Sequence, residues 1–333
     1  MIETTLFHPV ALETDLGAGP IAAHLMANDL VLWRDSTGAV HAGVDRCPHR
    51  GAALSRGRVE GDLLECAYHG WRFDGGGRCV AVPALPHFVP PAEHRASMYS
   101  ARVAYGLIWV ALQADVPGDA PGLLPAFAAE DDARLRKVNC GPYDVATSGP
   151  RIVENFLDMS HFGFVHEGWL GSRDRVAMEP HPVAVTPTGF IATECMAWQP
   201  QSSLHATSGS MVEYTYEVNA PYTCVLTKVP EAGSVALAGF RESIAMFVCP
   251  LTAETSRVWI RLAMNDFASS DAVLQDFQHT IFSQDQPVLE SQRPRMLPIT
   301  DAAPVKELHS AADRSSAAYR RYLRERGVGY GVC

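Results

Sequence analysis

Two cysteines and two histidines lie close together near the start of the chain. The stretch RCPHRGAALSRGRVEGDLLECAYHGW places Cys47 two residues before His49, and Cys66 three residues before His69. Thiolates and neutral imidazoles are metal ligands, so this group predicts a metal site. A structural zinc site usually pairs Cys with Cys and His with His, whereas each short arm here carries one of each. The mixed arms favour a two-iron cluster to which each arm gives one ligand per iron.

The residues beside these arms agree with an iron–sulfur cluster. Gly51 and Gly70 are expected to let the backbone pass close to inorganic sulfides, and Pro48 stiffens one arm. Two imidazoles in place of thiolates make the cluster less negative, which raises its potential to roughly −150 to +300 mV. The pattern C-P-H-R-G … C-A-Y-H-G-W closely resembles the Rieske domain of Rieske-type non-haem iron oxygenases. A zinc site is the alternative that the residues leave open.

A second group of polar residues lies in the segment ENFLDMSHFGFVHEG, which holds Asn155, Asp158, His161 and His166. Oxygen-activating Fe(II) prefers two histidines and one carboxylate, with other positions left open. Asn155, Asp158 and His161 follow at intervals of three, so they are expected to share one side of a helix. His166 lies about 140° further round an ideal helix. Both histidines can then reach one iron only through an irregular turn, which we predict near Gly163.

The order of the two motifs, with D-x-x-H-x4-H second, resembles that of the same oxygenases. The resemblance implies that His161 and His166 bind a mononuclear Fe(II). It also implies that Asp158 bridges His69 or His49 of the Rieske site to His161 on the electron route. A carboxylate that accepts N–H from both imidazoles shortens the path and fixes both tautomers. Without this resemblance, two histidines on an apolar segment would be interpreted as core residues.

The third iron ligand is expected far along the chain, in FSQDQPVLESQ at residues 282–292. This stretch resembles the family's late E/Q-D-x-x-V-x-E segment, which implies Asp285 as the ligand. Glu290 is the second candidate, and a solvated helix face is the alternative for both. Asn155 occupies a place that resembles a family position near the iron. There its side chain would hydrogen-bond to the iron site weakly or through water. Asp158 and Asn155 are therefore the predicted catalytic residues.

The chain is expected to be of the α+β class, with two domains. Residues 1–116 are expected to form an all-β Rieske domain, with hairpins at 30–45 and 71–83 and a single strand at 103–112. A Pro- and Gly-rich linker at 113–125 leads to a catalytic domain at 117–333. By resemblance, that domain holds an antiparallel sheet flanked by helices, as in helix-grip or START-like folds.

Within the second domain, the pattern predicts two neighbouring strands and two helices. SIAMFVCP and SRVWIRLAMND are expected to be strands joined by LTAET. Apolar residues in helical register predict a helix over 269–292, and a charged helix is predicted over 305–327, stopped by Gly327.

Composition excludes several classes of function. The net charge is −10 and there is no Lys/Arg run, so no nucleic-acid partner is expected. No stretch approaches the roughly 18 apolar residues of a membrane helix, and MIETTLFHPV lacks the features of a signal peptide. We therefore expect a cytoplasmic protein without a membrane partner, whose other cysteines are buried free thiols.

The resemblance implies the terminal oxygenase of a multicomponent monooxygenase. The chain length and motif order resemble the short group of vanillate and dicamba O-demethylases and toluenesulfonate methyl-monooxygenases. These imply hydroxylation or oxidative demethylation of a small, aromatic substrate with O2, in a homotrimer. Electrons would come from a separate NAD(P)H-dependent reductase, in some cases through a ferredoxin, because no G-x-G-x-x-G follows a strand here. The alternatives are a natural-product tailoring oxygenase and a Rieske electron-transfer protein.

Substrate contacts are less well marked in the sequence. Candidates for the pocket are aromatic and apolar residues near the second motif, although the core is the favoured place for each: Phe156, Leu157, Phe162, Phe164, Trp169 and Met211. Three cations could pair with an anionic substrate, although an exposed face is favoured for each: Lys228, Arg241 and Arg257.

Overall fold

The computed structural model describes residues 2–114, 116 and 124–333. The chain divides into two compact units, residues 1–124 and 125–333, and each is described by itself. The expected domain boundary at 116/117 falls among residues 115 and 117–123, which lie outside the described residues. In the part of the chain that is described, no helix combines the length and apolar character needed to cross a membrane.

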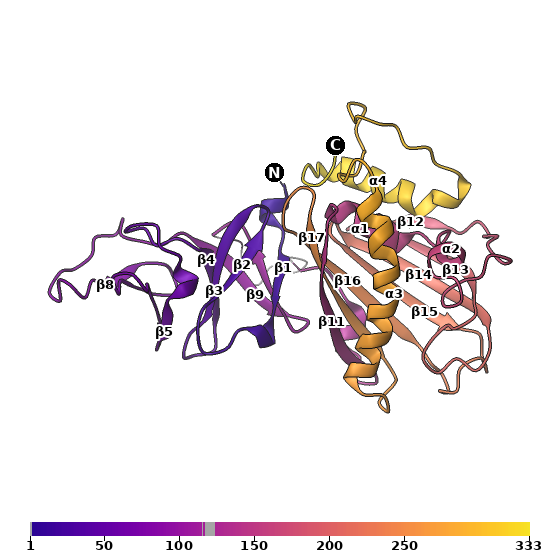
Figure 1. Ribbon diagram of the computed structural model, residues 1–333, viewed down its shortest axis with the longest axis horizontal. Coiled ribbons are helices and arrows are strands. Elements are labelled where there is room, and N and C mark those ends of the chain that lie inside the picture. Colours follow the sequence, from indigo (N-terminus) through magenta and orange to yellow (C-terminus); the bar gives the residue numbers. More distant parts are fainter. Residues whose placement is uncertain (1, 115, 117–123) are drawn as a thin grey trace. The chain divides into compact units, whose positions relative to one another are not determined.

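The first unit consists of strands and short 3-10 turns (Figure 1). Its elements are η1 (Ile2–Thr5), β1 (His8–Leu12), η2 (Glu13–Asp15), β2 (Ile21–Leu25), β3 (Asn28–Arg34), β4 (Val40–Val44), η3 (Leu54–Arg56), β5 (Arg58–Glu60), β6 (Leu63–Glu65), β7 (Arg72–Phe73), β8 (Cys79–Ala81), β9 (Met98–Ala104) and β10 (Leu107–Ala111). They form a six-stranded sheet in the order β1-β10-β9-β4-β3-β2 and a four-stranded sheet in the order β5-β6-β7-β8.

Both predicted hairpins of this unit are confirmed, since β3 pairs with β4 and β7 with β8. The single strand expected at 103–112 is wrong, because this run contains a hairpin turn between β9 and β10. Tyr105 and Gly106 have φ of +58° and +70°. Two successive left-handed residues give the turn whose twist matches that of the paired strands. The apolar run at 103–112 hid this turn, since β10 is apolar and buried throughout.

The second unit combines one large sheet with helices (Figure 1). Its elements are η4 (Ala128–Asp131), β11 (Arg136–Val145), α1 (Gly149–Leu157), α2 (Phe162–Val165), β12 (Val183–Val185), β13 (Phe190–Gln199), β14 (Ser210–Ala220), β15 (Thr223–Pro230), β16 (Glu242–Pro250), β17 (Ser256–Met264), α3 (Asp271–Ser291), η5 (Ala311–Asp313) and α4 (Arg314–Arg326). The sheet order is β11-β17-β16-β15-β14-β13-β12. Every neighbouring pair is antiparallel, as the predicted α+β class requires.

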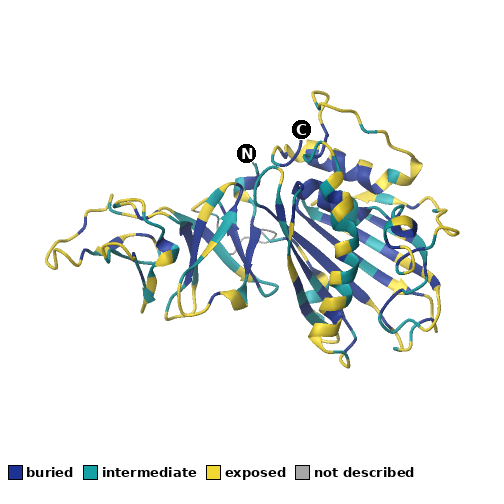
Figure 2. Cartoon of the chain, viewed as in Figure 1, coloured by how far each residue is buried: buried dark blue, intermediate teal, exposed yellow. Residues whose placement is uncertain are grey.

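Helices pack against this sheet, and its strand β16 is buried on both faces (Figure 2). All nine residues of β16 are buried. The long helix α3 packs against β11, where the rings of Phe282 and Tyr143 stack with centroids 4.3 Å apart. The Ser270 side chain caps α3 by accepting the N–H of Val273. The sheet and α3 together form the frame that holds the second group of polar residues.

The two helices expected here form, and β16 and β17 are paired as predicted. The last helix, however, begins at Arg314 and not at 305. Ser310 and Asp313 form a capping box that starts a short 3-10 turn before it, while Gly327 ends the helix at φ +67°. The cysteines outside the first motif form no disulfide among the described residues, and each is buried except the half-buried Cys333.

Candidate functional site

The two arms that carry Cys47 and Cys66 fold into the same turn. In each arm the cysteine carbonyl accepts the N–H of the glycine four residues later, at 2.9 Å for Gly51 and 3.0 Å for Gly70. The cysteine N–H donates to the carbonyl one residue beyond that glycine, at 2.8 and 2.9 Å. Both glycines are left-handed, with φ of +73° and +69°. The turn itself therefore requires glycine at these positions.

The four side chains of these arms converge. Cys47 and Cys66 are buried, and the rings of His49 and His69 lie with centroids 4.6 Å apart. Among the described residues, the buried Nδ1 of His49 finds no hydrogen-bond partner, which leaves it free to bind a metal. Burial, reinforced by the Cys66 thiol, raises the pKa of Cys47 to about 11. A bound cluster must displace that proton, and this donor set of two sulfurs and two nitrogens fits a Rieske 2Fe-2S cluster.

The second group of residues lies at a break between two helices. Asp158 follows α1 with extended backbone (φ −90°, ψ 130°), and α2 begins only after His161. The expectation that Asn155, Asp158 and His161 share one side of a helix is therefore wrong. The chain turns before the first histidine, which aims His161 independently of α1.

The irregular turn predicted near Gly163 is also wrong. α2 is a regular helical turn, in which the N–H of Val165 donates to the His161 carbonyl at 2.8 Å. Gly163 lies inside it, where an added Cβ would lie 2.6 Å from the Val176 side chain. This glycine allows close packing, and the two histidines lie at the two ends of α2, His161 as its N-cap and His166 as its C-cap.

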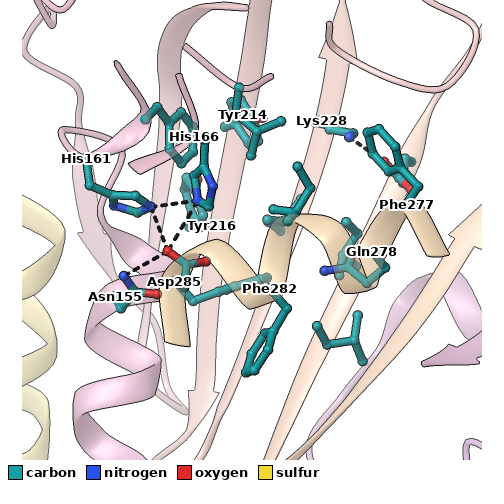
Figure 3. A pocket seen from close by; sticks show the side chains of 18 residues that line it. Asn155, His161, His166, Tyr214, Tyr216, Lys228, Phe277, Gln278, Phe282 and Asp285 are labelled. Carbon is teal, nitrogen blue, oxygen red and sulfur yellow. Dashed lines mark hydrogen bonds and ion pairs between the residues drawn. The ribbon is translucent and has the colours of Figure 1, made fainter. Parts of the chain in front are cut away.

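His161, His166 and Asp285 meet at one point (Figure 3). The Nε2 atoms of the two histidines are 3.2 Å apart. Oδ1 of Asp285 lies 3.4 Å from Nε2 of His161 and 3.2 Å from Nε2 of His166. Two ligands that bind one metal ion at about 2.1 Å, with an angle of 90–110°, are roughly 3.0–3.4 Å apart. The three side chains thus have the chemistry and the spacing of an iron site with open positions.

Further side chains orient this triad. Nδ1 of His161 donates to Oδ2 of Asp158 at 3.0 Å, and Nδ1 of His166 donates to Oε1 of Gln284 at 2.8 Å. Each bond leaves Nε2 unprotonated and aimed at the shared point. Sequence reasoning missed Gln284, and its only signal was its place next to Asp285. Asn155 lies beside the triad, and its amide donates to Oδ1 of Asp285 at 3.4 Å.

Two pKa shifts reflect these contacts. Burial acts to raise the pKa of Asp158, but hydrogen bonds from His161 and Ser160 outweigh it and hold the pKa below its ordinary value. Burial likewise acts to lower the pKa of His166, but the carboxylate of Asp285 outweighs it and the pKa is raised. Asp158 is therefore an anion at neutral pH, as its contact with an imidazole N–H requires.

A pocket opens beside the triad, between α3 and the sheet (Figure 3). Of the six candidates from sequence, Phe156 and Phe162 line it, whereas Phe164 and Met211 are exposed and Leu157 and Trp169 lie elsewhere. The remaining lining residues are Asn155, His161, His166, Leu170, Tyr214, Tyr216, Leu226, Lys228, Glu242, Ile244, Ile260, Phe277, Gln278, Ile281, Phe282 and Asp285. Most were missed, because they come from strands and from α3, and the sequence does not reveal the register of these strands or how α3 packs against them.

The second candidate ligand and the three candidate cations lie in distinct places. Glu290 accepts the N–H of Ala146 at 3.1 Å and is not part of the triad. Arg241 is exposed, and Arg257 pairs with Asp144 outside the pocket. Lys228, expected on an exposed face, is buried in the pocket wall.

Two segments of the chain match known families. Residues 7–96 match the Rieske 2Fe-2S domain, and residues 145–327 match the vanillate O-demethylase oxygenase C-terminal domain. The chain belongs to the Rieske non-haem iron oxygenases. It is the terminal oxygenase component of a Rieske monooxygenase, whose cofactors are a 2Fe-2S cluster and a mononuclear iron. Members of the family work with a separate reductase.

Relatives cover nearly the whole chain. The methylxanthine N1-demethylase NdmA of Pseudomonas putida is 31% identical, over 96% of this chain and 88% of that protein. The probable methylxanthine N7-demethylase NdmC of Pseudomonas sp. (strain TJI-51) is 35% identical, over 72% of this chain and 82% of that protein. The structure of NdmA with caffeine superimposes with a TM-score of 0.83 at 30% identity. The match covers 97% of this chain and 90% of NdmA. Dicamba monooxygenase, at 23% identity, shares the fold with a TM-score of 0.78. The match covers 97% of this chain and 96% of that protein.

Proposed function

We propose that this oxygenase removes a methyl group oxidatively from a small, flat, N- or O-methylated ring compound. The observation that carries the proposal is the convergence of His161, His166 and Asp285 at one end of a pocket lined with aromatic rings. The names of NdmA and NdmC describe methylxanthine N-demethylases, which supports an N-methyl heterocycle as substrate.

In this proposal the triad holds the mononuclear iron, and Cys47, His49, Cys66 and His69 hold the cluster. When bound, these groups supply O2 activation and one-electron transfer. One turnover takes the methylated ring, O2, two electrons and two protons to the demethylated ring, formaldehyde and water. The protein's part is to place the methyl group at the open side of the triad and to exclude water from it. The aromatic lining suits both tasks, because it contacts a flat ring without competing for the iron.

Asp158 is proposed as the entry point for electrons. Its side chain is 28% exposed, while one of its oxygens accepts the Nδ1 proton of His161. An anion that reaches both solvent and an iron-ligand imidazole can accept a second imidazole N–H from a cluster ligand, His69 or His49, of another copy. We therefore propose a head-to-tail homotrimer, with electrons from an NAD(P)H-dependent reductase, directly or through a ferredoxin.

The experiment is a product assay with iron-loaded protein, a competent reductase and a panel of N- and O-methylated ring compounds. We expect formaldehyde and the demethylated ring in equal amounts, with NADH use measured in parallel to detect uncoupled O2 reduction. His161→Ala is the negative control, and His24→Ala on the surface is its matched partner. A hydroxylated or desaturated product without formaldehyde would instead indicate a tailoring oxygenase. Cluster reduction without any product from the panel would count against demethylation.

A further inference from the structure

A buried ion pair lies in the wall of the pocket. Nζ of Lys228 is 2.6 Å from Oε2 of Glu242, with 6% and 10% of the two side chains exposed. The residues are directly opposite each other on β15 and β16, so both side chains leave the sheet on the same face. Both line the same pocket as the triad. We propose that Lys228 and Glu242 determine substrate specificity, by binding the polar edge of a neutral heteroaromatic ring that carries adjacent N–H and C=O groups; this rests on the proposed function.

The fold itself gives no reason for charges at this place. The neighbouring residues that line this wall, Leu226, Ile244 and Ile260, are apolar. A buried ion pair adds little net stability, because the cost of removing both charges from water offsets their attraction. Two apolar residues of similar volume would pack there at least as well. In a cavity wall, however, the pair presents a hydrogen-bond donor and an acceptor side by side.

The pair lies at the end of the pocket away from the triad. Gln278 and Asp285 are both on α3, seven residues or about 10 Å apart along the axis, and on nearly the same side of the helix. Glu242 and Gln278 also line a neighbouring hollow together with Phe277, whereas no member of the triad does. Figure 3 shows Lys228 near Phe277, across the pocket from His161. A flat molecule of one or two rings can therefore present a methyl group to the triad and its opposite edge to the pair.

The charge balance at this end of the pocket disfavours anions. Among the described residues that line it, Lys228 is the only lysine or arginine, and Glu242 neutralises it. At this end of the pocket, away from the iron, an aromatic carboxylate would meet no unbalanced cation and would approach the carboxylate of Glu242. A neutral ring can instead donate an N–H to Glu242 and accept from Lys228, with the Gln278 amide close by. This arrangement favours a ring with a lactam- or imide-like edge over a ring that carries a carboxylate.

The test is equilibrium binding to the iron-loaded, oxidised protein without reductase, so that no turnover occurs. The probes are theobromine, whose imide N–H lies between two carbonyls, caffeine, in which that N–H is methylated, and 4-methoxybenzoate as the anion. We expect wild type to bind theobromine at least tenfold more tightly than either other probe. Glu242→Gln leaves Lys228 unbalanced, so this variant should bind 4-methoxybenzoate at least tenfold more tightly than wild type and theobromine more weakly. A pair with a purely structural role would not reverse the preference.

A second variant keeps the test decisive where Glu242→Gln fails to fold. Lys228→Met combined with Glu242→Leu should keep the melting temperature and iron content, yet lose at least tenfold in theobromine binding. Glu130→Gln, which breaks the half-buried pair with Arg261 outside the pocket, should leave all three affinities unchanged. The proposal is overturned by a wild type that does not prefer theobromine, or by a double variant that binds it as tightly as wild type. A wild type that binds theobromine but releases no formaldehyde from it counts against demethylation and not against this recognition.

Discussion

The ring of His161 connects Asp158 to the centre of the catalytic unit. Its Nδ1 donates to Asp158 at 3.0 Å, while its Nε2 lies 3.4 Å from Asp285. One imidazole therefore spans the distance between a partly exposed carboxylate and the proposed iron site. The same hydrogen bond fixes the tautomer that can bind a metal.

Replacing Asp158 should separate electron delivery from metal binding. Asp158→Asn removes the negative charge but keeps an oxygen that can accept from His161, so both metal sites should fill as in wild type. Product formation should fall by about 100-fold, because the charged bridge between the two sites is lost. Iron content and NADH-coupled product are the measurements, with the exposed Asp174→Asn as control. Turnover that survives in Asp158→Asn would exclude the proposed electron route.

Gln284 should matter for iron affinity although it contacts no iron. Gln284→Leu removes the acceptor for Nδ1 of His166, so the ring loses its preferred tautomer and orientation. Iron affinity should fall by about 10–100-fold. Gln286→Leu, two residues along α3, removes contacts with Asp144 and Glu290 and should leave iron binding unchanged. Equal iron affinity in the two variants would show that the Gln284 contact is dispensable.

The left-handed glycines of the Rieske arms predict a local effect on the cluster. Gly70→Ala places a side chain at φ +69°, which costs about 1–2 kcal/mol, and brings Cβ to 3.1 Å from Pro83. Cluster occupancy, read from visible absorption and iron content, should fall. Gly76→Ala meets only ordinary contacts and has no left-handed backbone, so it should keep full occupancy. Full occupancy in Gly70→Ala would contradict the turn as the reason for glycine.

His8 should make the first unit sensitive to acid. Burial lowers its pKa from 6.5 to about 4, although contact with Glu3 partly opposes the shift. Between these pH values the unfolded chain binds a proton that the folded protein does not. Stability is therefore full above pH 6.5 and falls as the pH drops toward 4, by up to about 3 kcal/mol. His8→Gln should flatten this dependence in unfolding experiments, whereas the surface variant His24→Gln should keep the wild-type slope.

Sequence alone predicted the parts of the site that depend on short-range spacing. Cys47, His49, Cys66 and His69 lie in two arms whose turns are local, so residue types and intervals are enough to predict each turn. The convergence of Asp285 with the two histidines could not be derived from spacing, because it depends on how α3 packs against the sheet. A resemblance to known proteins supplied that connection.

Other features depend on burial and register, which a single sequence does not show. The hairpin turn at Tyr105 and Gly106 lies within an apolar run. Gly106 was the only residue that could have indicated a turn there, because no polar turn residue is present. Lys228 was expected on the surface because charged residues usually lie there, yet Glu242 neutralises it inside the pocket. The break before His161 was misplaced because intervals of three resemble a continuous helix.

The central claim is that His161, His166 and Asp285 hold one iron that is separate from the cluster. The most direct measurement is iron per chain in wild type and in Asp285→Ala, with the Rieske absorption spectrum as an internal control. Wild type should contain about three irons, two in the cluster and one in the catalytic unit. Asp285→Ala should contain about two, with the cluster spectrum unchanged. Three irons in the variant, or zinc in place of the third iron in wild type, would contradict the claim.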